Sequence, residues 1–285
     1  MNNSKKQRNL IFDVGMHKGE DTDYYLKKGF NVIAFEADPY LVELCSKKFA
    51  REIKNKQLII VHGAIVKITS NTNDHVQFYR NKENSVWGTV LGDWAERNEI
   101  LGTSNEIIDV PVVNFAECIV KYGMPYYLKI DIEGMDTICL ESLFSFNERP
   151  DYISIESEKI SFKKLKKEIA LFKKLGYNRF KAINQSSITK LREPVNSCEG
   201  KYLNYQFLSG SSGPFGRDLP KKWVKSRMIN LEYWFIFLGY KFYGDNSKFK
   251  EQLFFRSLYY RVLKKIFKQP IPGWYDTHAK YSLVE

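Results

Sequence analysis

The sequence lacks the features that are typical of membrane, secreted and zinc-binding proteins. Its longest apolar stretch, Tyr233 to Tyr240, is much too short to cross a bilayer, and no early segment combines a basic start, an apolar run and a small-residue cleavage site. The four cysteines form no Cys-x-x-Cys pair and the four histidines are scattered, so we expect reduced thiols and no structural zinc site. These absences predict a cytoplasmic protein without a transmembrane segment.

Internal repeats and low-complexity runs are also missing, whereas apolar residues are abundant. Of the 285 residues, 44% are apolar and 15% are aromatic, which suffices for one sizeable core with an appendage and excludes a disordered chain. The net charge of +11 is uneven, because residues 219–285 hold 13 Lys and Arg against 5 Asp and Glu. The composition predicts a core over residues 1–218 and a basic, aromatic, mainly helical extension over residues 219–285 that packs on it.

The segment from Asn9 to Glu36 has the pattern of a nucleotide-binding half-unit. A short apolar strand runs into the turn Asp13-x-Gly15-x-x-x-Gly19, a helical pattern follows, and a second apolar strand ends at Glu36. Glycines let the backbone approach a ligand, and a carboxylate at a strand end can accept hydrogen bonds from ribose hydroxyls. The turn is neither the dinucleotide nor the triphosphate motif. It suits a ligand without phosphate and with a cationic amino-acid end, such as S-adenosylmethionine.

Apolar segments alternate with helical patterns along residues 1–208. Strands are predicted at residues 10–14, 32–36, 58–66, 75–79, 110–113, 126–134, 151–156, 178–183 and 202–208, and helices at residues 19–28, 39–53, 114–122, 135–145 and 162–175. Residues 80–109 show no clear period, so we expect mainly loop there. This alternation predicts an α/β fold with a mostly parallel sheet and helices on both faces.

Acidic side chains gather where the predicted strands end. They are Asp13, Glu36, Asp38, Asp131 and Glu156. In an open α/β sheet, ligands bind in the crevice at the carboxyl ends of the strands. The sequence therefore predicts one ligand site at this edge, built from separate segments of the chain.

Three of these segments together resemble a known family. Asp13-Val-Gly-Met-His-Lys-Gly19, Phe35-Glu-Ala-Asp-Pro39 and Leu128-Lys-Ile-Asp-Ile-Glu-Gly134 are similar to motifs of the FkbM-type family of S-adenosylmethionine-dependent methyltransferases. The resemblance covers roughly residues 9–185. It implies a Rossmann-like, seven-strand methyltransferase sheet and transfer of a methyl group to hydroxyls of sugars or polyketide-like small molecules.

The resemblance also implies roles for particular residues. The methionine end of the cofactor would be lined by the turn that starts at Asp13, through Gly15, His17, Gly19 and Thr22. Glu36 would hold the ribose hydroxyls. Asp38 and Ala64 would lie near the ribose or the adenine. Asp131 would sit beside the sulfonium and the incoming hydroxyl. The chain departs from the family where Gly-Ala-Asn-x-Gly is common and Gly15-Met-His17-Lys-Gly19 stands instead. This leaves the role of His17 open, although imidazole and carboxamide can make similar hydrogen bonds.

Methyl transfer to a hydroxyl needs a group that removes the hydroxyl proton. Asp131 is the first candidate for contact with the cofactor or the acceptor, although short acids before a helix also act as caps, which is the favoured interpretation of Glu133. His278 is a second candidate base, because its ordinary pKa suits proton removal near neutral pH. A metal site at Asp131 and Glu133 lacks companion histidines, and we expect none.

Two loops and the tail leave alternatives open. Ser209 to Gly216 is either a linker to the tail or a flap over the acceptor with Phe215 as its apolar contact, and Asn84 to Gly88 is either an acceptor-side element or an ordinary loop. Residues 249–267 have the pattern of a helix with a basic face. Packing on the core is the favoured interpretation. A surface for an acidic glycan, a phosphate-bearing substrate or a membrane leaflet comes next, and nucleic acid is least favoured.

The sequence therefore predicts an S-adenosylmethionine-dependent O-methyltransferase acting on a hydroxyl of a sugar, a glycan or a small secondary metabolite. The alternatives are an RNA methyltransferase that uses the basic tail, and a non-catalytic scaffold that binds the cofactor. The acceptor and the oligomeric state do not follow from the sequence.

Overall fold

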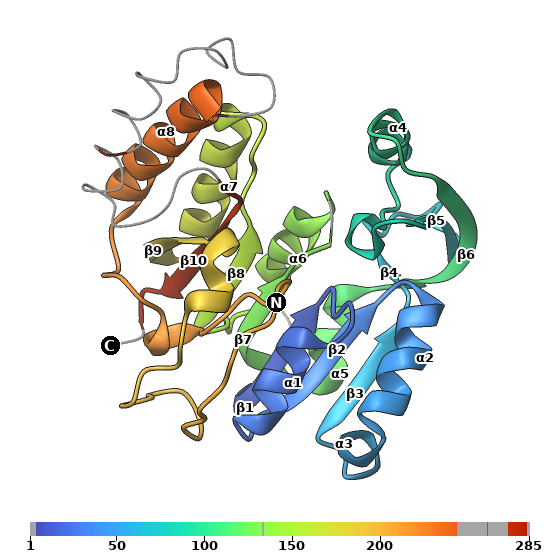
Figure 1. The fold of residues 1–285 in the computed structure, drawn as a ribbon. Coiled ribbons are helices and arrows are strands. Elements are labelled where there is room, and N and C mark those ends of the chain that lie inside the picture. Colours follow the sequence, from blue (N-terminus) through green and yellow to red (C-terminus); the bar gives the residue numbers. More distant parts are fainter. Residues whose placement is uncertain (1–3, 133, 244–260, 262–272, 284–285) are drawn as a thin grey trace.

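A seven-stranded sheet forms the centre of the computed structural model, which describes residues 4–132, 134–243, 261 and 273–283 (Figure 1). The strands lie in the order β3-β2-β1-β7-β8-β10-β9. They are Lys6–Val14 (β1), Asn31–Glu36 (β2), Leu58–His62 (β3), Met124–Ile130 (β7), Tyr152–Glu156 (β8), Tyr177–Asn184 (β9) and Tyr275–Tyr281 (β10). Strands β3, β2, β1, β7 and β8 are parallel neighbours, and β10 runs antiparallel to β8 and β9. The predicted mostly parallel sheet is confirmed.

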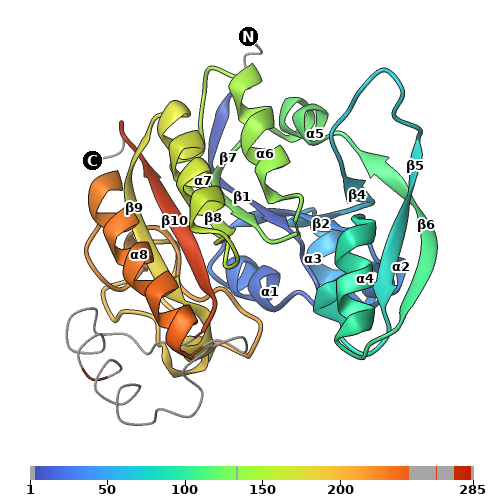
Figure 2. The same cartoon turned by 90° about the horizontal axis from the view of Figure 1, so that it is seen from above.

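Helices cover both faces of this sheet. They are Glu20–Lys27 (α1), Pro39–Lys48 (α2), Ala50–Lys54 (α3), Phe115–Tyr122 (α5), Asp136–Ser142 (α6), Phe162–Lys174 (α7) and Ser226–Tyr243 (α8), with short 3-10 helices at Leu143–Ser145 (η2), Gln185–Lys190 (η3) and Gly216–Asp218 (η4). Helices α5, α6 and α7 lie on one side of the sheet and α1 on the other (Figure 2). Two start as their sequences predict: Asp38 caps α2 by accepting from the Tyr40 N–H at 2.9 Å, and Asn114 caps α5.

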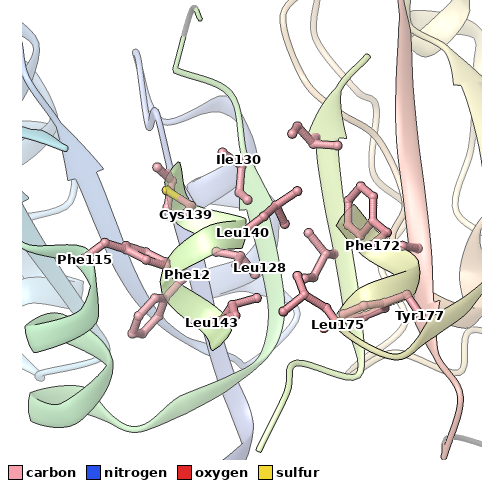
Figure 3. Packing of buried hydrophobic residues seen from close by; sticks show 14 of the residues in the cluster. Phe12, Phe115, Leu128, Ile130, Cys139, Leu140, Leu143, Phe172, Leu175 and Tyr177 are labelled. Carbon is pink, nitrogen blue, oxygen red and sulfur yellow. The ribbon is translucent and has the colours of Figure 1, made fainter. Parts of the chain in front are cut away.

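Alternating side chains of β1 divide between the two layers. Phe12 packs in the cluster under α5, α6 and α7, where it meets Leu140 of α6 and neighbours from β7 (Figure 3). Ile11 belongs to the other cluster, with Tyr25 of α1. Strand β7 is buried at every position, as a parallel strand between two helical layers must be. Burial on both faces explains why these strands appear in the sequence as continuous apolar runs.

A smaller three-stranded sheet lies at the β1 to β3 side of the central sheet (Figure 1). Its strands, in the order β4-β6-β5, are Ala64–Ile65 (β4), Asn105–Val113 (β6) and His75–Asn81 (β5), and it is joined by Ser85–Trp87 (η1) and Gly92–Ile100 (α4). The edge strand predicted at residues 75–79 is confirmed. The prediction of mainly loop over residues 80–109 was wrong. Strand β6 pairs with β5 at seven positions, from Asn105 opposite Asn81 to Pro111 opposite His75, and this pairing between distant segments leaves no clear local period.

The end of the chain returns to the central sheet. Strand β10 lies between β8 and β9 (Figure 2), so the sheet draws residues from both sides of the boundary predicted at 218/219. The division of the chain into core and extension stays a prediction, and the predicted helix over residues 249–267 lies outside the described residues except at 261. No helix in the described part of the chain combines the length and the apolar character needed to cross a bilayer.

The prediction of a strand at residues 202–208 was wrong. The segment makes only an isolated bridge, between Gln206 and Arg192. Its aromatic residues pack on α1 instead: the rings of Tyr205 and Phe207 lie 5.0 and 4.9 Å from that of Tyr24. The place beside β9 in the sheet is occupied by β10.

Candidate active site

A cavity of about 1380 Å³ opens at the carboxyl ends of the parallel strands. The turn after β1, the end of β2, strand β4 and the segment after β7 all contribute to its wall. Six of the residues predicted for the site line it: Gly15, His17, Glu36, Asp38, Ala64 and Asp131. The fold thus brings together side chains that are more than a hundred positions apart in the sequence.

The turn after β1 is held in a conformation that favours glycine. Gly15 has φ +83°, and its N–H donates to the Phe35 carbonyl at 3.0 Å. A Cβ atom at Gly15 would overlap the carbonyl oxygen of Asp131. Gly19 has φ +72°, and a Cβ atom there would overlap the ring of Phe49. The two glycines are therefore required by close packing, and Gly15 also exposes backbone to the cavity.

Glu36 is fixed at the rim of the cavity by two backbone donors. Its Oε2 accepts from the His17 N–H at 2.8 Å, and its Oε1 accepts from the Asp38 N–H at 2.9 Å. Burial raises the pKa of Glu36 to about 7, although both hydrogen bonds favour the charged form. Each carboxylate oxygen has a second lone pair, so Glu36 can still accept hydrogen bonds from a ligand.

The imidazole of His17 joins the turn to the smaller sheet. Its Nε2 lies 2.8 Å from the hydroxyl of Ser85 in η1, and its Nδ1 lies 3.2 Å from a carboxylate oxygen of Glu20 in α1. The neighbouring segment, residues 84–90, lines the cavity beside it. The residue that departs from the family pattern therefore positions a wall of the cavity, and the segment Asn84 to Gly88 lies where an acceptor-side or cofactor-side element would.

The buried side chain of Lys129 contacts the turn after β1. Lys129 Nζ donates to the Gly15 carbonyl at 2.8 Å and lies 3.5 Å from Asp13, 3.9 Å from Asp21 and 3.7 Å from Asp131. Burial alone would lower the pKa of Lys129, but the three carboxylates outweigh it and raise the pKa, so the ammonium stays charged. Lys129 was not among the site residues predicted from the sequence. The available signal was a charged residue inside an otherwise apolar strand.

Asp13, Gly19 and Thr22 do not line the cavity. Asp13 and Thr22 are fully buried, and the Thr22 hydroxyl donates to Asp13 at 2.6 Å. Burial raises the pKa of Asp13, and the charge of Lys129 opposes that effect. These three residues pack on the side of the turn that faces away from the cavity. The contact with the cofactor that was expected of them is not seen in this geometry.

Comparison with known proteins agrees with this geometry. The model of the FkbM methyltransferase domain matches residues 13–179, which is more than half of the chain. The chain belongs to the FkbM methyltransferase family. It is therefore a methyltransferase with the expected Rossmann-like sheet, as the motifs around Gly15, Glu36 and Asp131 predicted.

Solved structures with similar folds are distant from this FkbM methyltransferase. A SAM dependent methyltransferase from Archaeoglobus fulgidus has 10% sequence identity and a TM-score of 0.38, with 96% of this chain and 87% of that chain covered. A precorrin-6y C5,15-methyltransferase from Geobacter metallireducens has 10% identity and a TM-score of 0.34, with 70% and 77% covered. No curated protein gives a significant match. The family assignment rests on the domain match, because these scores are too low to carry an argument.

Further acidic and aromatic residues line the cavity of this FkbM methyltransferase. Asp131, whose side chain is 46% exposed, is joined there by Glu156, Asp276 and Trp274. Glu133 lies outside the described residues. Within the described ranges, no three His, Cys, Asp or Glu side chains are placed to hold a metal ion together.

Ser209 to Ser212 also line the cavity, and they are attached to α1. The Ser212 N–H donates to Asp21 at 2.8 Å. Phe215 does not extend over the cavity. It is fully buried, and its ring stacks on Tyr127 with 4.6 Å between centroids. Residues 209–212 therefore form part of the cavity wall, and Phe215 packs in the hydrophobic core.

The structure does not bring His278 to the cavity. The residue lies within β10, is only 1% exposed, and is not among the lining residues. Burial, together with the nearby charge of Lys181, lowers the pKa of His278 to about 3. The imidazole is thus a neutral core group, and the proposed role of His278 as a base has no support in this geometry.

Proposed function

We propose that this FkbM methyltransferase transfers a methyl group from S-adenosyl-L-methionine to a hydroxyl of a sugar, a glycan or a small metabolite. The observation that carries the proposal is the meeting of Gly15, Glu36 and Asp131 at one cavity. These residues come from three neighbouring strands of the sheet, β1, β2 and β7. The methyl donor is S-adenosyl-L-methionine.

The cavity offers suitable groups for each part of the donor. Glu36 would accept hydrogen bonds from the ribose hydroxyls, and the backbone around Gly15 and His17 would hold the methionine end. Asp38 lies beyond Glu36, where Ala64 and Phe78 provide an apolar wall for the adenine. Asp131 would stand beside the sulfonium, whose positive charge a carboxylate stabilises.

The size of the cavity leaves room for an acceptor. Pockets for single drug-sized ligands measure about 300–1,000 Å³, and this cavity exceeds that range. We assign the acceptor to the part of the cavity that is lined by Asp131, Glu156, Asp276, Gln185 and Trp274, and call it the acceptor end. Carboxylates and an amide hydrogen-bond hydroxyl groups, and an indole packs on the apolar face of a sugar ring. These groups support a polyhydroxylated acceptor.

The chemistry requires little more than positioning and removal of one proton. The acceptor oxygen attacks the methyl carbon in line with the carbon–sulfur bond, and the sulfonium leaves as a neutral thioether. The protein holds donor and acceptor in contact, excludes water and takes the hydroxyl proton. Carboxylates at the acceptor end can take a proton from the acceptor. This favours a hydroxyl acceptor, which must lose its proton, over an acceptor group that reacts without a base.

The proposal is tested with methyl-labelled S-adenosylmethionine and a panel of nucleotide sugars, glycans, small metabolites and short RNAs. We expect label in a hydroxylated carbohydrate or metabolite, and a rate at least 100-fold lower for Asp131→Asn. The control Asp109→Asn changes an exposed carboxylate of β6 outside the cavity and should keep the wild-type rate.

Other outcomes separate the alternatives. Label only in RNA would replace this proposal by an RNA methyltransferase. Binding of the donor without label in any acceptor would favour a scaffold, and absence of donor binding in calorimetry would contradict the proposed cofactor. The cytoplasmic location and a membrane contact of the basic tail stay predictions, which cell fractionation would test.

A further inference from the structure

Strands β8 and β10 place two carboxyl groups opposite each other at the acceptor end of the cavity. Glu156 is the last residue of β8 and Asp276 is the second residue of β10, and the two are direct partners in the antiparallel register. Both line the cavity. Cβ atoms of direct partners are about 4.5–5.5 Å apart, and like charges so placed destabilise a sheet. A pair of this kind at a cavity calls for a functional explanation.

The side chain of Asp276 is directed by its neighbour in the strand. The Thr277 hydroxyl lies 2.8 Å from that of Ser157 and 2.6 Å from the hydroxyl of Tyr233 in α8. Successive side chains of a strand point to opposite faces. Because Thr277 is bound on the α8 side, Asp276 faces the other way, toward the cavity that it lines.

Asp276 is nearly buried, and its carboxyl has no partner among the residues that the structure describes. Only 7% of the residue is exposed, and within the described ranges its carboxyl makes no hydrogen bond and no ion pair. Glu156 differs, because Lys159 Nζ donates to it at 2.8 Å. An unpartnered buried carboxyl that lines a cavity is a group from which a ligand contact is missing.

The charges that face Asp276 come from every element packed around it. Burial has the largest effect on the pKa of Asp276. Asp131 after β7, Glu156 of β8 and Asp21 of α1 also raise it, and Lys129 of β7 lowers it. The pKa therefore stands well above its ordinary value. The pKa of Glu156 is also raised, by burial and by Asp131. A carboxyl with a raised pKa is a stronger base than an ordinary aspartate.

We propose that Asp276 is the catalytic base of this enzyme, and that Glu156 is the positioning residue that sets its proton affinity. The inference rests on the proposed methyl transfer to a hydroxyl. As the acceptor oxygen forms its bond to the methyl carbon, the carbon–sulfur bond breaks and its electron pair goes to sulfur. The hydroxyl proton passes to the Asp276 carboxylate, which becomes a neutral carboxylic acid and later loses the proton to solvent.

The positive charge of the donor affects the ionisation of Asp276. A sulfonium in the cavity favours the charged form of a nearby carboxyl, so binding of S-adenosylmethionine should lower the pKa of Asp276 and promote loss of its proton to solvent. S-Adenosylhomocysteine is a neutral thioether and has no such effect. The donor therefore favours the ionised base, and the methyl-depleted product does not.

Calorimetry with the full chain tests the assignment without a known acceptor. S-Adenosylmethionine and S-adenosylhomocysteine are titrated over a series of pH values, each in two buffers of different ionisation enthalpy, which counts the protons released. We expect the wild-type protein to release more protons with the sulfonium than with the thioether. Asp276→Asn should remove most of this difference and bind S-adenosylhomocysteine within about threefold of wild type. Asp109→Asn should keep the difference.

A second variant covers the case in which Asp276→Asn does not fold. Glu156→Gln removes the facing negative charge, so Asp276 should ionise at lower pH and the difference in proton release should move to lower pH. An unchanged difference in both variants, or in Glu156→Gln alone if the other does not fold, would overturn the role of Asp276 and leave the proposed function intact. Failure of the wild-type protein to bind S-adenosylmethionine would overturn the proposed function and this inference together.

Kinetics complete the test once the panel has identified an acceptor. Asp276→Asn should lower kcat by about 100- to 10,000-fold, which is the usual contribution of a general base, with little change in KM for the donor. A kcat within threefold of wild type would show that another group takes the proton.

Discussion

Gly15 and Asp131 lie so close together that no side chain fits between them. A Cβ atom on Gly15 would overlap the Asp131 carbonyl oxygen, the Asp131 N–H donates to the Val14 carbonyl at 2.9 Å, and Lys129 Nζ donates to the Gly15 carbonyl at 2.8 Å. The turn proposed to hold the methionine end and the acid proposed to face the sulfonium therefore pack directly against each other. We expect a change at one of them to affect the other.

Gly15→Ala should disrupt this unit. We expect the free energy of unfolding to fall by about 2 kcal/mol or more, because alanine at positive φ costs about 1–2 kcal/mol and the overlap adds to it. Affinity for S-adenosylmethionine should fall more than tenfold. Gly102→Ala is a matched control, since Gly102 has φ +91° and open space around its Cβ position. Denaturant unfolding and calorimetry measure both effects, and equal losses in the two variants would contradict the close-packing argument.

Glu36→Gln should weaken donor binding by about 1–3 kcal/mol, because an amide cannot replace a carboxylate that accepts from two backbone donors and from the ribose. The pKa of Glu36 is about 7, so the carboxylate prevails above pH 7 and the protonated form below it. Wild-type affinity should therefore increase from pH 6 to pH 8, and the variant should show a flatter profile. Glu43→Gln on the exposed face of α2 is the control, and an unchanged affinity in Glu36→Gln would refute the ribose assignment.

Lys129→Met should destabilise the fold strongly, because it leaves Asp13 and Asp21 buried without a counter-charge. Loss of one partner of a buried ion pair costs about 3–5 kcal/mol. Adding Asp13→Asn should recover part of the loss, since it removes one of the uncompensated charges. Urea unfolding of the two variants checks this. A loss below about 1 kcal/mol for Lys129→Met would mean that the acids are already neutral in the folded protein.

His278 should make stability depend on pH. Its pKa is about 3 in the folded protein and near 6.5 when unfolded, so between these values only the unfolded chain binds the proton. Stability is then lost as pH falls, by about 2 kcal/mol from pH 7 to pH 5. His278→Gln should remove this contribution and keep methyl transfer, whereas the exposed His75→Gln should keep the wild-type slope. Loss of methyl transfer in a folded His278→Gln variant would instead support His278 as the base.

The regions that were predicted correctly are those in which local sequence and burial agree. Apart from Lys129, strand β7 is apolar from Met124 to Ile130 because helices cover both of its faces, and Asp38 and Asn114 mark helix starts through contacts only two or three residues away. The acids at strand ends followed from the same logic, since parallel strands that alternate with helices end at one edge.

The regions that were missed depend on pairing between distant segments. Residues 80–109 were expected to be loop, yet β6 is held by β5, and α4 packs on both strands. Residues 202–208 were expected to be a strand, but the rings of Tyr205 and Phe207 pack on Tyr24 of α1. Of the polar residues on β10, His278 was selected from the sequence and Asp276 was not. Both are polar residues on one strand, and the sequence does not show where along that strand the cavity begins.

The sequence by itself determined the succession of strands and helices, the glycine turn after β1 and the acids at Glu36 and Asp131, because these depend on periodicity, on backbone conformation and on where each strand ends. Only the tertiary structure decided that β10 enters the sheet between β8 and β9, that Lys129 supports the turn from below, and that Asp276 reaches the cavity while His278 is buried. The reason is physical: the register of a strand and the burial of a charge are set by partners that lie far away in the chain.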